Sequence, residues 1–305
     1  MRIVSLLPSA TEIAFALGLG DQVVAVSHEC DYPPAARQRP AVTRSPLHGH
    51  ALSSREIDER TARELREGGT LYYLDTDRLR DLAPDLILTQ ELCDVCAVAP
   101  QEVERAVRTL GTVPRVLSLE PNTLADVLQT IRIVGTATGR EAEAEALVAR
   151  LAERIARVRQ AADGVADRPR VFCLEWTDPP WVAGHWVPEM VALAGGIDVL
   201  GEAGAPSMRV EWERVRAAAP EVLVLMPCGF DLARTLAEAA VVRALPSWDA
   251  LPAVGAGRVY AVDGSSYFNR PGPRLVDGLE LLAHLLHPER FARPPLPGAA
   301  APLAV

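Results

Sequence analysis

The stretch Val171-Phe172-Cys173-Leu174-Glu175-Trp176-Thr177-Asp178-Pro179-Pro180-Trp181 places a short apolar run directly before acidic and aromatic side chains. Similar arrangements occur at residues 23–33, 86–96 and 222–229. Short apolar runs between helical stretches are typical of buried parallel strands. An open α/β sheet binds its ligands at the carboxyl ends of such strands. The pattern therefore predicts an α/β fold with a ligand site at the strand ends.

Composition limits the classes of partner. The chain has 305 residues, 49% of them hydrophobic and 23% charged, which fits a globular protein long enough for two lobes. A net charge of −9 argues against nucleic acid, because phosphates are neutralised by clustered Lys and Arg. No apolar run approaches the roughly 20 residues of a membrane helix. We expect a monomer that binds a small molecule and does not span a membrane.

A weak internal repeat indicates two similar lobes. Residues 82–88 and 218–224 each combine a helix end, a proline and a buried strand. Between them, residues 123–162 are strongly helical, and the run from 140 to 162 contains neither Gly nor Pro. We expect an N-terminal α/β lobe at residues 1–122, connecting helices at 123–164 that limit lobe motion, and a C-terminal α/β lobe at 165–290. The Pro- and Ala-rich tail, residues 291–305, is expected to be disordered or loosely packed.

The first residues bear on the compartment. Ile3 to Leu6 is expected to form the first strand, and Ser9 with Glu12 matches a capping box that opens a helix. Pro8 and Glu12 interrupt a run that otherwise resembles a signal peptide. Five cysteines, an odd number, favour a reducing compartment. We expect a cytoplasmic protein, or alternatively a periplasmic or cell-surface protein whose leader has been removed.

The cysteines suggest one kind of site. Cys93 and Cys96 have the spacing of a redox pair or of half a zinc site, and with His28 and Cys30 they could supply four metal ligands. The alternative is that these thiols line an apolar cleft as small hydrophobic groups. No second CxxC or HxxxH pattern supports a structural zinc site.

Aromatic and acidic residues suggest two other kinds of site. Trp176 and Trp181 bracket a loop, where flat apolar rings suit a large planar ligand, although any single Trp is more often part of a core. Glu175 and Asp178 would suit acid–base chemistry. A nucleophile elbow, a Walker loop and a GxGxxG motif are all missing from the sequence, so we expect a binding protein and not an enzyme.

Six stretches carry a family resemblance: residues 3–12, the Asp31-Tyr32-Pro33-Pro34 step, and residues 82–87, 178–181, 210–212 and 267–274. They resemble cobalamin-binding ABC-transporter substrate-binding proteins, and Cys30, Cys93 and Cys96 resemble a leaderless branch of them. The wider Fe/cobalamin periplasmic-binding-protein family also includes siderophore and haem binders. The resemblance implies two Rossmann-like lobes joined by a long helix, the class III arrangement, with a corrinoid held between them as ligand and no catalytic cofactor.

The resemblance also implies site residues, to which the strand-end positions Cys30 and Gln90 are added. The expected ligand-binding residues are Pro8, Ser9, Cys30, Tyr32, Gln90, Glu175, Trp176, Trp181, Trp212, Tyr267, Asn269 and Arg270. The family docks on its permease through one surface Glu per lobe, and the nearby candidates here are Glu102, Glu211 and Glu213. A Trp that cobalamin receptors carry after an N-lobe strand is replaced by residues 90–96.

The expected function is binding of cobalamin or a related corrinoid, for uptake or salvage with an ABC transporter. The alternatives are a binding protein for another metal chelate, a siderophore or haem, or a cysteine-based metal-handling protein.

Overall fold

The computed structural model describes residues 1–47, 52–67, 69–90, 98, 100–111, 113–291, 296 and 298–303. It divides into two compact units: unit 1 comprises Met1–Pro121 and Asp126–Ala149, and unit 2 comprises Asn122–Ala125 and Arg150–Val305. The boundary between the units falls inside one long helix, whereas the sequence predicts a separate connecting segment.

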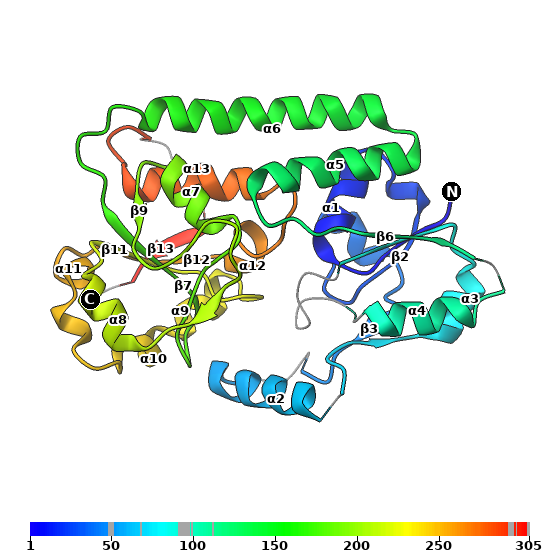
Figure 1. Ribbon diagram of the computed structural model, residues 1–305, viewed down its shortest axis with the longest axis horizontal. Helices are drawn as coiled ribbons and strands as arrows, with labels where there is room; N and C mark the ends of the chain where they lie inside the picture. Colours follow the sequence, from blue (N-terminus) through cyan, green and yellow to red (C-terminus); the bar gives the residue numbers. More distant parts are fainter. Residues whose placement is uncertain are drawn as a thin grey trace. The chain divides into compact units, whose positions relative to one another are not determined.

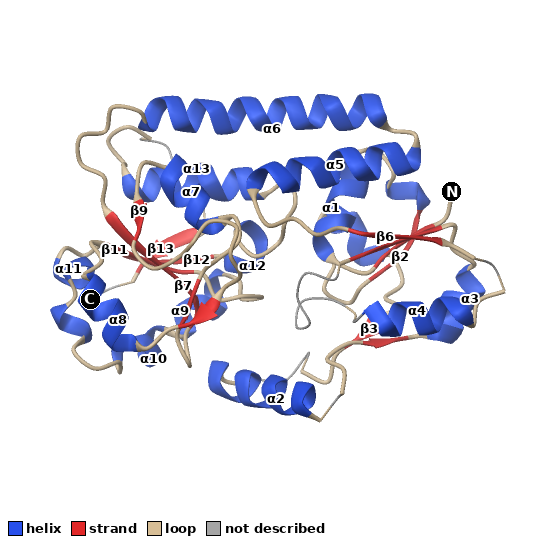
Figure 2. Cartoon of the chain, viewed as in Figure 1, coloured by secondary structure: helices blue, strands red, loops and turns tan. Residues whose placement is uncertain are grey.

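Unit 1 is built on a parallel sheet of apolar strands. Its strands are β1 (Ile3–Ser5), β2 (Val23–Val26), β5 (Leu86–Thr89) and β6 (Arg115–Ser118), in the order β2-β1-β5-β6. All three pairings are parallel, so the four carboxyl ends meet at one edge. Helices cover both faces of this sheet (Figure 2), which explains why β1, β2 and β5 read as continuous apolar runs.

The other elements of unit 1 lie around this sheet. They are α1 (Pro8–Ala16), η1 (Gly20–Gln22), η2 (Pro34–Gln38), β3 (Thr43–Arg44), α2 (Ser54–Arg66), β4 (Tyr73–Leu74), α3 (Thr76–Leu82), α4 (Pro100–Arg108) and most of α5 (Leu124–Thr138). Leu79 of α3 and Val103 of α4 pack in the same buried cluster as Val4 and Ile87 of the sheet.

The predicted capping box at Ser9 and Glu12 is wrong. The N-cap of α1 is Leu7, which makes no side-chain cap, and Pro8 opens the helix. Proline is well suited to the first helical position because its fixed φ matches the helix and its missing N–H would be unpaired there. Ser9 and Glu12 therefore lie inside the helix, and both are buried.

A capping box does occur at the start of α2. The Glu56 N–H donates to Ser53 Oγ at 3.3 Å, and the Ser53 N–H donates to Glu56 Oε2 at 2.8 Å. The same S-x-x-E pattern at residues 9–12 and 53–56 thus forms a cap only where no proline sets the helix start.

Unit 2 has a larger mixed sheet. Its strands are β7 (Arg170–Trp176), β8 (Trp181–Val182), β9 (Ile197–Asp198), β10 (Met208–Arg209), β11 (Val222–Leu225), β12 (Val259–Val262) and β13 (Ala300–Pro302). The order is β10-β8-β7-β11-β12-β13, and β9 pairs with β7. Strands β7, β11 and β12 are parallel, so their carboxyl ends share one edge.

The helices of unit 2 complete a three-layer arrangement. They are the C-terminal part of α6 (Glu141–Ala162), α7 (Val187–Leu193), α8 (Trp212–Ala218), α9 (Leu232–Ala237), α10 (Ala239–Arg243), η3 (Trp248–Ala250), α11 (Pro252–Gly255), α12 (Gly264–Tyr267) and α13 (Leu275–Leu286). Figure 1 shows α7 and α13 on one side of this sheet and α8 to α10 on the other.

The prediction of a disordered tail is wrong for residues 300–303. Strand β13 pairs antiparallel with β12 at the sheet edge, and the adjoining Leu303 is 4% exposed in the core of unit 2. An edge strand tolerates Pro302 because only one of its sides needs ladder hydrogen bonds. Apolar burial therefore holds a segment whose composition alone favours disorder.

Helix α6 is a single uninterrupted helix of 22 residues (Figure 1). In unit 1, Arg132 of α5 donates to both carboxylate oxygens of Glu145 at 2.8 and 3.2 Å. In unit 2, Arg154 donates to Asp277 and Glu280 of α13, and these partners raise the pKa of its guanidinium. Each unit thus fixes its own part of α6 by side-chain ion pairs.

Within the described ranges, none of the helices combines the length and the apolar character needed to cross a membrane.

Candidate functional site

The carboxyl edge of the unit 1 sheet is lined by hydroxyl groups. Ser5, Thr89 and Ser118 are the last residues of β1, β5 and β6, and Ser27 directly follows β2. Thr89 is 1% exposed, and its buried Oγ1 has no hydrogen-bond partner among the described residues. Gln90 comes next and is also buried. This edge therefore offers small hydrogen-bonding groups on every strand.

Cys30 lies among these hydroxyl groups. Its Sγ is 3.1 Å from Thr11 Oγ1 and 3.4 Å from Ser27 Oγ, and Thr11 Oγ1 is 2.8 Å from Ser5 Oγ. The residue is only 5% exposed. The expectation that this thiol packs as a small hydrophobic group in an apolar cleft is therefore wrong, because its neighbours are hydrogen-bonding.

His28 has partners of its own. Its Nδ1 is 2.7 Å from Thr43 Oγ1, its Nε2 is 3.3 Å from Glu29 Oε1, and its ring lies 5.6 Å from that of Tyr72. Cys93 and Cys96 lie outside the described residues. In the part of the chain that is described, no group of three or more His, Cys, Asp or Glu side chains is placed to hold a metal.

The remaining unit 1 candidates differ in exposure. Pro8 and Ser9 form the first turn of α1, with Ser9 only 3% exposed. Tyr32, on the loop after β2, is 45% exposed and presents its ring at the surface of the unit. Their contact with a ligand stays a prediction.

Aromatic side chains gather at the carboxyl edge of the unit 2 sheet. Trp176, the last residue of β7, is directly opposite Trp181 of β8, and its ring lies 5.2 Å from that of Phe230. Within the part of the chain that is described, the buried Trp181 Nε1 atom has no hydrogen-bond partner. The sequence analysis missed Phe230, although it follows β11 by only a few residues and the strand-end rule covers it.

Glu175 precedes Trp176 on β7 and has polar neighbours. Ser207 Oγ donates to Glu175 Oε2 at 2.8 Å, and the Gly184 N–H donates to Ser207 Oγ at 3.1 Å. Burial raises the pKa of Glu175 to about 7, against the opposing effect of hydrogen bonds from Ser207 and Gly184. The sequence analysis did not identify Ser207, which lies 32 residues away in the chain.

A third part of this edge follows β12. Asn269 Nδ2 donates to the Met226 carbonyl at 3.4 Å, whereas its Oδ1 is buried without a hydrogen-bond partner. The Arg274 guanidinium lies 5.6 Å from the centre of the Tyr267 ring, and Arg270 is half-buried. The structure thus places the candidates from residues 175–181 and 267–270 in one unit, after β7 and β12, the parallel strands on either side of β11.

Trp212 occupies a different position from the other candidates. It is 5% exposed, its ring stacks 6.1 Å from that of Trp248, and its Nε1 donates to the Pro246 carbonyl at 2.9 Å. It belongs to the buried cluster that includes Phe172 and Leu223. These contacts give Trp212 a structural role in the core, and its expected ligand contact stays a prediction.

The expected docking residues all reach the surface. Glu102 of α4 pairs with Arg105 at 2.7 Å, and Glu211 is the exposed N-cap residue of α8. Glu213 lines a surface pocket of about 360 Å³ together with Arg216 and Ser247. No contact in the described chain tests their role.

Comparisons with known proteins agree with this architecture. The model of the periplasmic binding protein family matches residues 3–265. The vitamin B12-binding protein of Vibrio cholerae serotype O1 (strain ATCC 39541 / Classical Ogawa 395 / O395) is 26% identical over 283 residues, which are 92% of this chain and 86% of that protein.

Two solved structures are similar over nearly the full length. The periplasmic haem-binding protein RhuT from Roseiflexus sp. RS-1, in its apo form, has a TM-score of 0.71 and 28% identity, covering 95% of this chain and 98% of that one. The periplasmic vitamin B12-binding protein BtuF of Vibrio cholerae has a TM-score of 0.67 and 25% identity, covering 93% and 96%. The two α/β units and the long helix are those of the class III fold. The chain therefore belongs to the periplasmic binding protein family.

Proposed function

We propose that this protein binds cobalamin or a related corrinoid and delivers it to an ABC transporter. We expect Tyr32 of unit 1 and Trp176 of unit 2 each to contact an apolar part of the ligand. Hydrogen-bonding groups at the strand ends of each unit bind its peripheral amides. The protein captures the ligand without chemical change, as expected in a family of substrate-binding proteins.

One observation carries the proposal: the paired indoles of Trp176 and Trp181 stand at the strand ends of unit 2 beside Phe230. Flat aromatic surface with a polar edge suits a large, planar, amphipathic ligand. The buried and unpartnered atoms Trp181 Nε1 and Asn269 Oδ1 are a donor and an acceptor in the same unit. Vitamin B12-binding relatives over most of the chain support the corrinoid as that ligand.

Haem is the second candidate. The similarity to RhuT, a haem-binding protein at 28% identity, favours it specifically. Haem shares the planar metal-chelating ring of a corrinoid but carries two carboxylates in place of the neutral amides. The described edge of unit 2 carries Arg270 and Arg274 after β12, whereas the acidic Glu175 on β7 disfavours a carboxylate at its own position.

The test is a titration of the purified protein with cyanocobalamin, hydroxocobalamin and haem, followed by visible absorbance and calorimetry. We expect saturable binding of both cobalamins and weaker binding of haem. Binding of haem alone would move the assignment to the second candidate, and binding of none would overturn both. A siderophore or a free metal ion would be tested next under reducing conditions, with metal analysis of the protein as isolated.

Transporter docking is a separate part of the proposal. We propose that Glu102 in unit 1 and Glu211 and Glu213 in unit 2 contact the permease; Glu102 lies on the surface of α4, and Glu213 lines a surface pocket. Charge reversal, Glu102→Lys or Glu213→Lys, should leave corrinoid affinity unchanged and weaken association with the permease. Unchanged association in both variants would remove Glu102 and Glu213 from the docking surface.

A further inference from the structure

Glu175 is an unusual residue for an aromatic binding edge. It lies on β7 immediately before Trp176, and its Oε2 is held by Ser207 Oγ at 2.8 Å. In the part of the chain that the structure describes, no Lys or Arg forms an ion pair with it. A carboxylate that is buried without a cation is costly to ionise.

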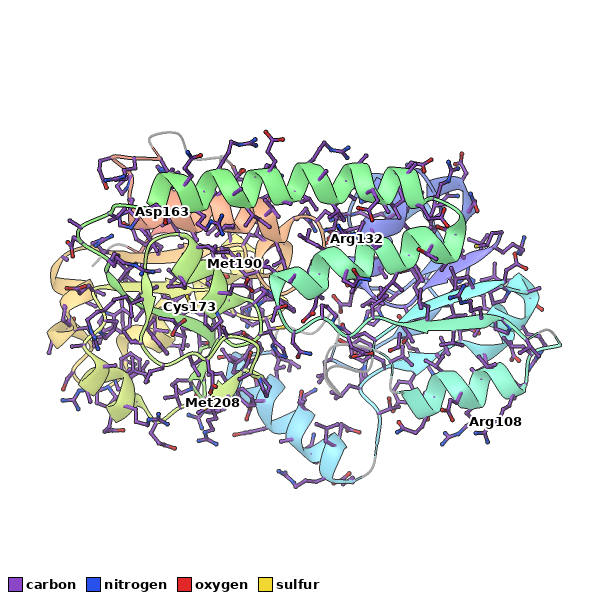
Figure 3. All side chains as sticks on the ribbon, turned by 45° about the horizontal axis from the view of Figure 1, so that its top comes forward. Arg108, Arg132, Asp163, Cys173, Met190 and Met208 are labelled. Atoms are coloured by element: carbon purple, nitrogen blue, oxygen red, sulfur yellow. The ribbon has the colours of Figure 1, made fainter. Side chains whose placement is uncertain are left out.

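Among the residues that the structure describes, no cation acts to lower the pKa of Glu175. Cys173, labelled in Figure 3, lies two residues before Glu175 on β7. Burial raises the pKa of the Cys173 thiol, and the negative charges of Asp198 and Glu175 raise it further. His185 follows Gly184 on the turn after β8. Burial lowers the pKa of His185 and so favours its neutral form. Arg209 of β10 is exposed. The segment after β11 contacts Glu175 through its backbone, where the Cys228 N–H donates to the Glu175 carbonyl at 3.0 Å.

Glu175 has two forms with different chemistry toward a ligand. The protonated form donates a hydrogen bond to a carbonyl or a carboxylate, and the ionised form accepts one from an amide N–H but repels a carboxylate. Because burial raises the pKa of Glu175 to about 7, both forms are populated near neutral pH. An amide offers both an N–H and a carbonyl, so it can pair with either form, whereas a carboxylate pairs with only one.

We propose that Glu175 is a specificity-determining residue that favours ligands with peripheral amides over ligands with a carboxylate at the same place. Ser207 positions the carboxyl group, and Trp176 and Trp181 hold the ring next to it. This inference rests on the proposed function and names the chemical feature of the ligand that Glu175 favours, its peripheral amides. A corrinoid with intact amides is accepted at every pH, and an anionic edge is rejected as the pH rises.

The test compares ligands that differ only at the periphery. Cyanocobalamin and its isomeric monocarboxylates, in each of which one amide has become a carboxylate, are titrated into the wild type, Glu175→Gln and Glu202→Gln at pH 6 and pH 8. Glu202 is an exposed carboxylate of the same unit and serves as the matched control. Circular dichroism confirms that each variant is folded, and the pH dependence of the wild type provides a readout that needs no mutation.

For the wild type at pH 8, we expect the most affected monocarboxylate to bind about tenfold more weakly than cyanocobalamin, and the ratio to shrink at pH 6. Glu175→Gln should remove most of that ratio at both pH values, and Glu202→Gln should keep it. Equal ratios in wild type and Glu175→Gln for every isomer would overturn the inference and leave the proposed function intact.

If the protein binds haem and no corrinoid, haem and its dimethyl ester form the corresponding pair, with the same expectations. Binding of neither chelate would overturn the proposed function, and the inference would fall with it.

Discussion

The two units share one structural device and differ in what their strand ends present. In unit 1, Ala83 ends α3 with a φ of 39°, and Asp85 accepts the Arg2 N–H at 2.7 Å. In unit 2, Ala219 ends α8 with a φ of 46°, and Glu221 accepts the Arg170 N–H at 2.9 Å. The internal repeat seen in the sequence is therefore a repeated turn that joins a helix to a strand.

The strand ends diverge although this framework repeats. Unit 1 presents hydroxyl groups and the Cys30 thiol, whereas unit 2 presents indole rings and a carboxyl group. All five tryptophans of the chain lie in unit 2, at positions 176, 181, 186, 212 and 248. The turn between helix and strand is therefore alike in the two units, while the residues just beyond the strands differ in chemistry. Because every tryptophan lies in unit 2, tryptophan fluorescence reports on unit 2 alone.

The largest loss of stability should come from replacing a core residue of unit 2, and a residue at the edge of its sheet should matter less. Trp212→Ala should lower the free energy of unfolding by about 3–5 kcal/mol, because it removes a buried indole and leaves the Pro246 carbonyl unpaired. Trp176→Ala, at a half-buried edge position, should cost less than half as much. Urea denaturation followed by fluorescence measures both, and equal losses would contradict the assignment of Trp212 to the core.

The next prediction compares the ion pairs by which each unit holds its part of α6. Arg154→Ala should cost about 2 kcal/mol, because Asp277 and Glu280 then face each other without a cation in a half-buried setting. Arg132→Ala breaks a more exposed pair in unit 1 and should cost less than about 1 kcal/mol. Denaturation followed by circular dichroism tests the pair of variants. A larger loss from Arg132→Ala would reverse this comparison.

A pH effect should be specific to unit 2. Burial raises the pKa of Glu175 from 4.5 to about 7, so between those values the unfolded chain releases a proton that the folded chain keeps. The contribution of this group to stability is complete below pH 4.5 and is lost as the pH rises through 7. The change is about 2 kcal/mol once residual exposure is allowed for.

The variant Glu175→Gln isolates the contribution of this carboxyl group to the pH dependence of stability. Glu175→Gln should flatten the fall in stability across this pH range, as measured by fluorescence-detected unfolding, while Glu202→Gln should follow the wild type. Parallel pH profiles for the wild type and Glu175→Gln would show that Glu175 ionises as freely in the folded protein as in the unfolded chain.

The smallest effect tests the shared turn. Asp85→Ala and Glu221→Ala should each lower the free energy of unfolding by about 1 kcal/mol, because each removes one exposed hydrogen bond. Asp85 accepts from the Arg2 N–H just before β1, and Glu221 accepts from the Arg170 N–H at the start of β7. Similar losses, measured by chemical denaturation, would support a repeated device. A loss confined to one unit would show that the repeat is only a resemblance of sequence.

Much of this architecture was accessible from sequence because it is local. Apolar runs predicted β2, β5, β7 and β11, and the period of apolar residues predicted α5 and α6. The strand-end rule also located Glu175, Trp176 and Trp181. These features depend on neighbouring residues, so a single sequence contains the information.

The rest depends on contacts between distant residues. Thr177 Oγ1 donates to the buried Glu238 at 2.6 Å across 61 positions, and no local pattern indicates that pair. The stacking of Trp212 on Trp248 and the pairing of β13 with β12 are likewise set by tertiary packing. Sequence reasoning therefore found the edge residues of the candidate site but not Ser207, which orients one of them.

The most direct test of the account is a calorimetric titration of the wild type, Tyr32→Ala and Trp176→Ala with cyanocobalamin, with tryptophan fluorescence recorded in parallel. The account predicts saturable, equimolar binding that quenches the fluorescence of unit 2, and weaker binding in both variants because each unit contributes an aromatic contact. A wild type that takes up no cyanocobalamin, or variants that both bind it as tightly as the wild type, would contradict it.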